Sequence, residues 1–221
     1  MKMGAMNYDA DIARLTDAAT RLALKGLFHA GDTLSMRLAG CGQMLLFTAS
    51  NDALKMEITP LTPHSPDGSM VSQHLAVYQI RPDVGSILLN RQPWARSLQA
   101  LGADMPGVFD EQVRHLGKAV RLLDHPPGEP VTDTQLRNGA NAWVLPQQVL
   151  CLGTVPERTV FNAELLEKCA KAYVLAQSTG LPVGRIPWLV RWIANGRLMK
   201  DERRAAADYA AGRAPVLSTA Y

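Results

Sequence analysis

The chain has 221 residues and a mass of 24.1 kDa, a length that fits one large domain. Apolar residues make up 47% and charged residues 19% of the sequence, which is enough apolar material for a core and excludes an intrinsically disordered chain. The formal net charge of +3 is too small to indicate nucleic-acid binding, so we expect no nucleic-acid partner.

The cysteines and the first residues bear on the cellular compartment. Cys41, Cys151 and Cys169 form no C-x-x-C pair, and an odd number favours reduced thiols over a disulfide framework. Acidic and basic residues precede any apolar stretch, so no signal peptide is expected. No run approaches the roughly 18 apolar residues of a membrane span. We expect a cytoplasmic protein without a membrane partner, with one domain over residues 1–221 in which 185–221 form a C-terminal helical extension.

The first half of the chain mixes helical and strand-like patterns. Apolar residues at helical spacing predict a helix over 11–25, with Asp11 as its N-cap and Gly26 after its end. A β-hairpin follows, and then a short strand and a turn-rich loop. A second helix is stopped by Pro82, and the next run has the composition of a buried strand. The expected ranges are 33–38 and 43–48 for the hairpin, 54–58 for the strand, 60–68 for the loop, 69–80 for the helix and 86–89 for the buried strand.

The second half continues the alternation. Helices are expected over 93–101, 132–142, 161–177 and 187–210, a strand over 120–123, and a strand–turn–strand over 143–153. Helices alternate with strand pairs that look like hairpins, which favours an α/β fold whose sheet has antiparallel parts and is covered by helices.

Three segments together resemble a known family. Gly26–Arg37 carries a glycine-containing entry loop, His74–Gly85 reads HLAVYQIRPDVG, and Trp143–Gly153 precedes a long helix. These segments resemble the class II aldolase/adducin domains, in the same order, over roughly residues 11–177. The resemblance implies a three-layer α/β/α fold with a central, largely antiparallel or mixed sheet.

The same resemblance implies that a zinc site has been lost. In active members of the family, one Glu and three His hold a divalent metal that stabilises an enediolate. The matching positions here are Met70, Leu89, Arg91 and Gln147, none of which suits zinc. We therefore expect no metal, no other cofactor and no metal-dependent aldolase activity. Asp32 also stands where the family has a phosphate-binding glycine, and its charge would repel a phosphate.

Several residues are candidates for a pocket that binds a small anionic ligand. Arg91 could pair with a carboxylate or phosphate, and Trp94 could stack on a planar ligand. The alternative is that Arg91 pairs with a carboxylate of a neighbouring subunit and that Trp94 only packs. The other candidates are Gln92, His74, Ser69, Thr33 and Gln147. We expect His74 to be a packed helix histidine, and an improvised metal site of His64, Asp67 and His74 fits no known ligand spacing.

The C-terminal region has an apolar face. Trp188/Trp192 and Leu189/Ile193 are i,i+4 pairs on adjacent strips of the expected helix. This face either packs on the domain's own sheet or is buried against a neighbouring subunit. The family's commonly tetrameric members imply a homo-oligomer, either a dimer or a tetramer.

Two functions are compatible with these patterns. The first is a binding or assembly protein that retains the aldolase fold without its zinc chemistry. The second is a metal-independent lyase or isomerase that acts on a small sugar phosphate or carboxylate through Arg91, with His74 or Tyr78 as an acid or base.

Overall fold

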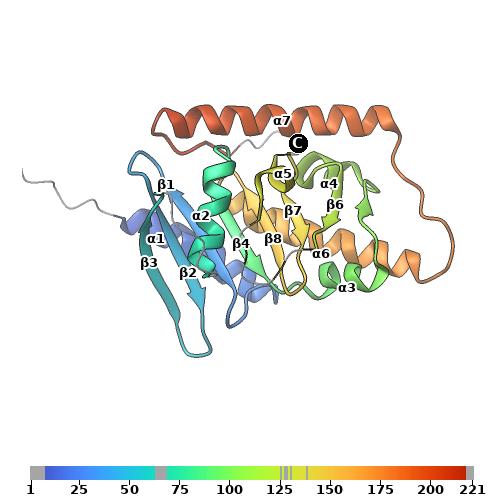
Figure 1. Cartoon of the computed structure of the whole chain (residues 1–221), viewed down its shortest axis with the longest axis horizontal. Coiled ribbons are helices and arrows are strands. Elements are labelled where there is room, and N and C mark those ends of the chain that lie inside the picture. The colour runs from blue at the N-terminus through green and yellow to red at the C-terminus, as the bar shows by residue number, and fades with distance from the viewer. Residues whose placement is uncertain are drawn as a thin grey trace, which may run out of the picture.

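The computed structural model describes residues 8–62, 69–124, 126, 129, 131–137 and 139–217. Within these residues, eight strands form a sheet in the order β3-β2-β1-β4-β8-β7-β6-β5, and helices flank it (Figure 1). The helices are α1 (Asp9–Leu24), α2 (Met70–Ile80), α3 (Pro93–Leu101), α4 (Asp110–Leu116), α5 (Asp133–Leu136), α6 (Pro156–Gln177) and α7 (Trp188–Ala210). The strands are β1 (Thr33–Leu38), β2 (Gln43–Ala49), β3 (Leu54–Pro60), β4 (Ser86–Asn90), β5 (Met105–Pro106), β6 (Ala119–Leu122), β7 (Ala142–Val144) and β8 (Val149–Gly153).

The strand pairing confirms the predicted mixed α/β fold. β6 and β7 are parallel, and every other neighbouring pair is antiparallel. The predicted hairpin is β1–β2, and β3 adds an exposed strand at the edge of the sheet. β1 also pairs with β4, which places Thr33 opposite Leu89. This register brings the entry loop before β1 and the C-terminal end of β4 to the same edge of the sheet, the one formed by the ends of the strands.

Two apolar clusters occupy the two faces of the sheet. One joins α1, α3 and α6 to the strands, and the other joins α2 and α5 to the opposite face. The predicted stripe on α6 is part of the first cluster, where Leu166 and Cys169 are buried. Trp143 is fully buried in the second cluster. Every residue of β4 and β8 is buried, as expected of strands covered on both faces.

Several predicted boundaries were wrong. α1 begins at Asp9 after Tyr8, so Asp11 is not its N-cap. The helix predicted over 132–142 is only the short α5, because the chain joins the sheet again at Ala142 as β7. α6 begins at Pro156, since a proline is compatible with the first turn of a helix. α4 and the two-residue β5 were not predicted, because segments this short carry little periodicity.

α7 runs across one end of the sheet and is fastened there by buried polar contacts (Figure 1). Arg81 donates to both carboxylate oxygens of Asp83, at 2.7 and 2.8 Å, and pairs with Glu202 of α7 at 3.2 Å. These three side chains are buried. Burial raises the pKa of Glu202 to about 8, and the positive charge of Arg81 opposes that shift. The RPDV segment thus ties the turn between α2 and β4 to the C-terminal half of α7.

The N-terminal half of α7 is much more exposed. Trp188 is 70% exposed and Trp192 67% exposed, and Leu189 and Ile193 are also open to solvent. The alternative in which this face packs on the domain's own sheet is therefore wrong. Within the described residues, no helix is both long enough and apolar enough to cross a membrane.

Gly85 is expected to be indispensable for the docking of α7. The Tyr209 hydroxyl donates to the Thr154 carbonyl at 2.8 Å, and a Cβ on Gly85 would lie 1.8 Å from that hydroxyl and 2.2 Å from that carbonyl. Gly85→Ala should lower the free energy of unfolding by about 1–3 kcal/mol or more in urea denaturation, because the backbone must shift.

Gly196→Ala is the matched control, since Gly196 lies within α7 and a Cβ there meets no atom within 4 Å. It should raise stability by up to about 1 kcal/mol, because alanine favours a helix over glycine. Equal stability of the Gly85→Ala variant and the parent would contradict the packing described here.

Candidate functional site

Arg91 lies directly after β4 and is held by the entry loop before β1. Its Nε donates to Asp32 Oδ1 at 3.1 Å, and its terminal NH2 donates to the Ala30 carbonyl. Asp32 is buried and also accepts from the His29 backbone N–H at 2.7 Å, whereas the Arg91 side chain is 45% exposed. Burial raises the pKa of Asp32, and the hydrogen bonds from His29 and Arg91 oppose this effect. The guanidinium therefore neutralises a buried carboxylate of its own chain.

The four positions that we expect to match the family's metal ligands carry side chains that are not zinc donors. Met70 opens α2, Leu89 is buried in the apolar cluster beneath α2, and Gln147 lies exposed in the turn between β7 and β8. Arg91 is already paired with Asp32. In the part of the chain that the structure describes, no group of three or more His, Cys, Asp or Glu side chains is placed to hold a metal ion. His64 and Asp67 of the improvised site lie outside the described residues.

His74 is part of a fully buried hydrogen-bond network. Its Nε2 lies 2.8 Å from Thr33 Oγ1 and its Nδ1 lies 2.7 Å from Ser35 Oγ, so both ring nitrogens have partners. Ser35 Oγ is also 2.8 Å from the Tyr78 hydroxyl. Burial lowers the pKa of His74 to about 3 and raises that of Tyr78. This supports the expectation that His74 is a packed histidine and places His74 and Thr33 in the core.

The other candidates also make contacts within the chain. The Gln92 side-chain amide is buried and donates to Asn90 Oδ1 at 3.2 Å and to Cys151 Sγ at 3.6 Å. Trp94 packs partly into the core, and its ring lies 5.6 Å from Lys171 Nζ.

Ser69 is the N-cap of α2 and accepts from the Ser72 backbone N–H.

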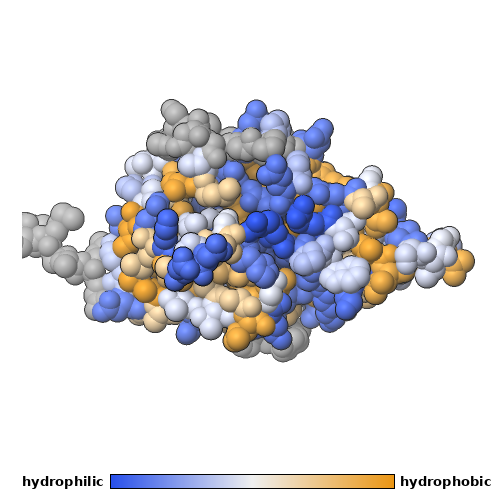
Figure 2. Space-filling model, turned by 90° about the horizontal axis from the view of Figure 1, so that it is seen from below, coloured by the Kyte–Doolittle hydropathy of each residue, from blue (hydrophilic) through white to orange (hydrophobic). Residues whose placement is uncertain are grey.

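Figure 2 shows a largely hydrophilic centre on the face seen from below, with apolar side chains on its flanks.

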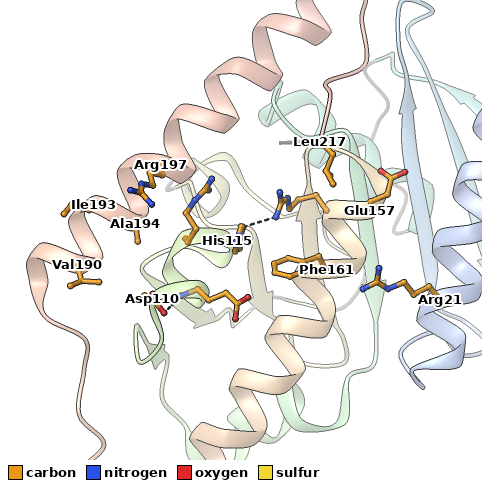
Figure 3. Close-up of a pocket in the computed structure, with 13 residues that line it drawn as sticks. Arg21, Asp110, His115, Glu157, Phe161, Val190, Ile193, Ala194, Arg197 and Leu217 are labelled. Carbon is orange, nitrogen blue, oxygen red and sulfur yellow. Dashed lines mark hydrogen bonds between the residues drawn. The ribbon is translucent and has the colours of Figure 1, made fainter. Parts of the chain in front are cut away.

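The structure has a cavity elsewhere, between α4, α6 and α7, that the sequence did not predict. Its volume is about 680 Å³, and none of the predicted pocket residues lines it. His115, Arg158 and Phe161 meet in its wall (Figure 3). His115 and Arg158 are 43 positions apart in the sequence, so no local spacing could have indicated this group.

The buried imidazole of His74 should make stability depend on pH. Its pKa of about 3 lies below the value of about 6.5 in an unfolded chain, so between these values the unfolded state binds the proton. The contribution of the neutral His74 imidazole to stability is therefore fully present above about pH 6.5, and it decreases as the pH falls below that value. His74 should account for about 2 kcal/mol of loss at pH 5.

This dependence can be measured by urea denaturation at pH 7.5 and pH 5.0. His74→Gln should lose about 2 kcal/mol less than the parent over this interval. Leu75→Ala, a neighbouring buried change that leaves the imidazole in place, should keep the parent's pH dependence. An NMR titration that places the His74 pKa near 6.5 would contradict the prediction directly.

Comparison with known proteins agrees with this architecture. Residues 17–174 match the family model of the Class II Aldolase and Adducin N-terminal domain. No curated protein matches the chain significantly.

Solved structures share the fold at low sequence identity. An L-fuculose 1-phosphate aldolase is 20% identical with a TM-score of 0.71, covering 89% of this chain and 100% of its own. L-fuculose 1-phosphate aldolase from Glaciozyma antarctica PI12 is 16% identical with a TM-score of 0.68, covering 94% and 92%. An aldolase II superfamily protein from Pseudomonas syringae is 16% identical with a TM-score of 0.65, covering 93% and 97%. Since the family model spans most of the chain and the sheet and helices agree, the chain belongs to the class II aldolase and adducin N-terminal domain family.

Proposed function

We propose that this chain is a binding or assembly protein that uses the class II aldolase fold without zinc-dependent aldolase chemistry. The observation that carries the proposal is the set of side chains at the matching ligand positions, Met70, Leu89, Arg91 and Gln147. A zinc site needs imidazole, thiolate or carboxylate donors, and none of these four side chains provides one.

The surroundings of these positions support the same conclusion. Leu89 lies opposite Thr33 of β1 and Leu150 of β8, and is buried in an apolar cluster. Arg91 brings a permanent positive charge, which opposes binding of a second cation nearby. Because Asp32 is paired with Arg91, its carboxylate is not free to bind a metal ion.

The alternative function is a metal-independent lyase or isomerase that acts through Arg91. The partial exposure of Arg91 favours it, because a carboxylate or phosphate could reach the guanidinium from solvent. Against it, the suggested acid or base groups His74 and Tyr78 are buried and hydrogen-bonded to Ser35. Burial moves the pKa of His74 to about 3 and raises that of Tyr78, whereas an acid or base that acts near neutral pH needs a pKa close to 7. The small-anion pocket around Arg91 stays a prediction.

The purified protein should contain well below one equivalent of zinc per chain after dialysis, because the matching positions offer no donor set. Elemental analysis and calorimetric titration with zinc chloride measure this. About one tightly held zinc per chain would contradict the proposal. In that case His64→Ala would show whether the donors come from the loop before α2.

We propose further that the exposed face of α7 holds together a homo-oligomer, either a dimer or a tetramer. Trp188, Leu189 and Trp192 lie together on its first turns and are about half to two-thirds exposed. Tryptophan side chains are common anchors of protein interfaces, and a solvated surface seldom presents two of them side by side.

Trp192→Ala should weaken the self-association by about 2–4 kcal/mol, as truncation of an interface anchor does. Light scattering over a dilution series measures the association, and Lys200→Ala, an exposed change on the same helix, is the control. A parent protein that is monomeric at micromolar concentration would contradict the assembly.

A further inference from the structure

We propose that the cavity between α4, α6 and α7 binds an organic anion that carries an apolar or aromatic body. Its volume of about 680 Å³ lies within the range of roughly 300–1,000 Å³ that is usual for small-molecule sites. Figure 3 shows side chains from the three helices around this space. The cavity is separate from the Arg91–Asp32 ion pair, since neither residue lines it.

Arginine side chains from all three helices supply the positive charge. Arg158 of α6 donates to His115 Nδ1 at 3.1 Å, and its guanidinium lies 5.4 Å from the centre of the Phe161 ring. Arg197 of α7 lines the cavity, and no acidic side chain of the described residues forms an ion pair with it. Arg114 of α4 also lines the cavity and pairs with Asp201.

His115 of α4 lies beside these arginines in the wall of the cavity. Burial and the positive charges of Arg158 and Arg114 together lower its pKa to about 3, and the nearby Asp201 opposes this shift. The imidazole is therefore neutral, and because Nδ1 accepts from Arg158, the proton lies on Nε2. No described residue accepts from that Nε2–H. It is available to a ligand oxygen beside the cationic groups.

Two of the three acidic residues of the lining pair with basic side chains. Glu157 accepts two hydrogen bonds from Arg14, at 2.5 and 2.6 Å. Glu111 lies 3.6 Å from Lys168 Nζ, and Asp110 accepts from the Glu111 backbone N–H. The charges of Glu157 and Glu111 are thus directed to groups outside the arginine cluster, whereas Asp110 forms no ion pair with a described residue.

Apolar side chains form the remaining wall. Phe161 packs edge-on against His115 with ring centres 4.9 Å apart, and Ile193 and Ala194 approach from α7. A ligand with only an anionic group would leave this surface uncovered, whereas an apolar or aromatic body would fill it. The combination selects an amphiphilic organic anion over a bare inorganic one.

The proposed site does not depend on the self-association of α7. An α-helix turns about 100° per residue, so Val190 and Ala194, which line the cavity, point about 200° away from Trp188 and Trp192 respectively. The ligand and the two tryptophans of the proposed subunit interface therefore lie on opposite sides of the helix, and Ile193 lies between them at the border of the cavity. Failure of one proposal leaves the other testable.

The experiment uses two fluorescent probes of similar shape, 8-anilinonaphthalene-1-sulfonate and its uncharged analogue N-phenyl-1-naphthylamine. The sulfonate should bind saturably, with one site per chain. Arg197→Gln should weaken its binding about tenfold or more, through loss of a charge-assisted contact, and Arg197→Lys should retain most of it. Binding of the uncharged probe should be weaker and should not change in Arg197→Gln.

The controls distinguish the cavity from the rest of the protein surface. Arg91→Gln should leave binding of the sulfonate unchanged, which excludes the edge of the sheet as the site. Phe161→Leu should weaken both probes, and circular dichroism and urea denaturation verify that each variant is folded. Equal affinity of the sulfonate for the parent and Arg197→Gln would overturn the proposal. So would an absence of saturable binding, or release of the probe as the protein self-associates, since a second copy would then occupy the cavity.

Discussion

The buried charge of Arg81 is the constraint around which the C-terminal half of the fold is arranged. An arginine in the interior is tolerated only where anions and carbonyl groups surround it. Here Asp83 supplies the negative charge, Glu202 adds a carboxyl group 3.2 Å from the guanidinium, and the Ala140 carbonyl accepts at 2.8 Å. Removing one partner of such a buried pair typically costs about 3–5 kcal/mol, so these segments must come together for the chain to fold.

The position of α7 follows from this contact. Glu202 and Tyr209 fix its C-terminal half against the turn between α2 and β4 and against Thr154. A helix is stiff, so its N-terminal half must continue across α4, where Ala194 and Leu198 are its buried residues. The exposed tryptophans and the cavity under α7 are both consequences of a helix that is anchored mainly at one end.

Local patterns predicted the elements well, and long-range partners could not be predicted. The apolar spacing of α6 and the strand-like runs of β1 and β2 are visible within a few residues, and the RPDVG segment pointed to the correct family. Yet the partner of Arg81 is 121 positions away on α7, and the partner of Arg91 is 59 positions away at Asp32. The candidate pocket around Arg91 was predicted from the resemblance to the family, and that resemblance could not indicate that Arg91 pairs with Asp32.

Asp32 and Arg91 are best understood as one structural unit. A buried carboxylate without a counter-charge is unfavourable, and Asp32 is buried beside the strand end where Arg91 emerges. Arg91 compensates that charge, and Asp32 in turn holds the guanidinium against the Ala30 carbonyl. A histidine at position 91 would leave Asp32 without its cation, while Leu89 would still keep its place in the apolar cluster. The ion pair thus holds the entry loop against the end of β4, and a substitution of either residue would leave the other without its partner.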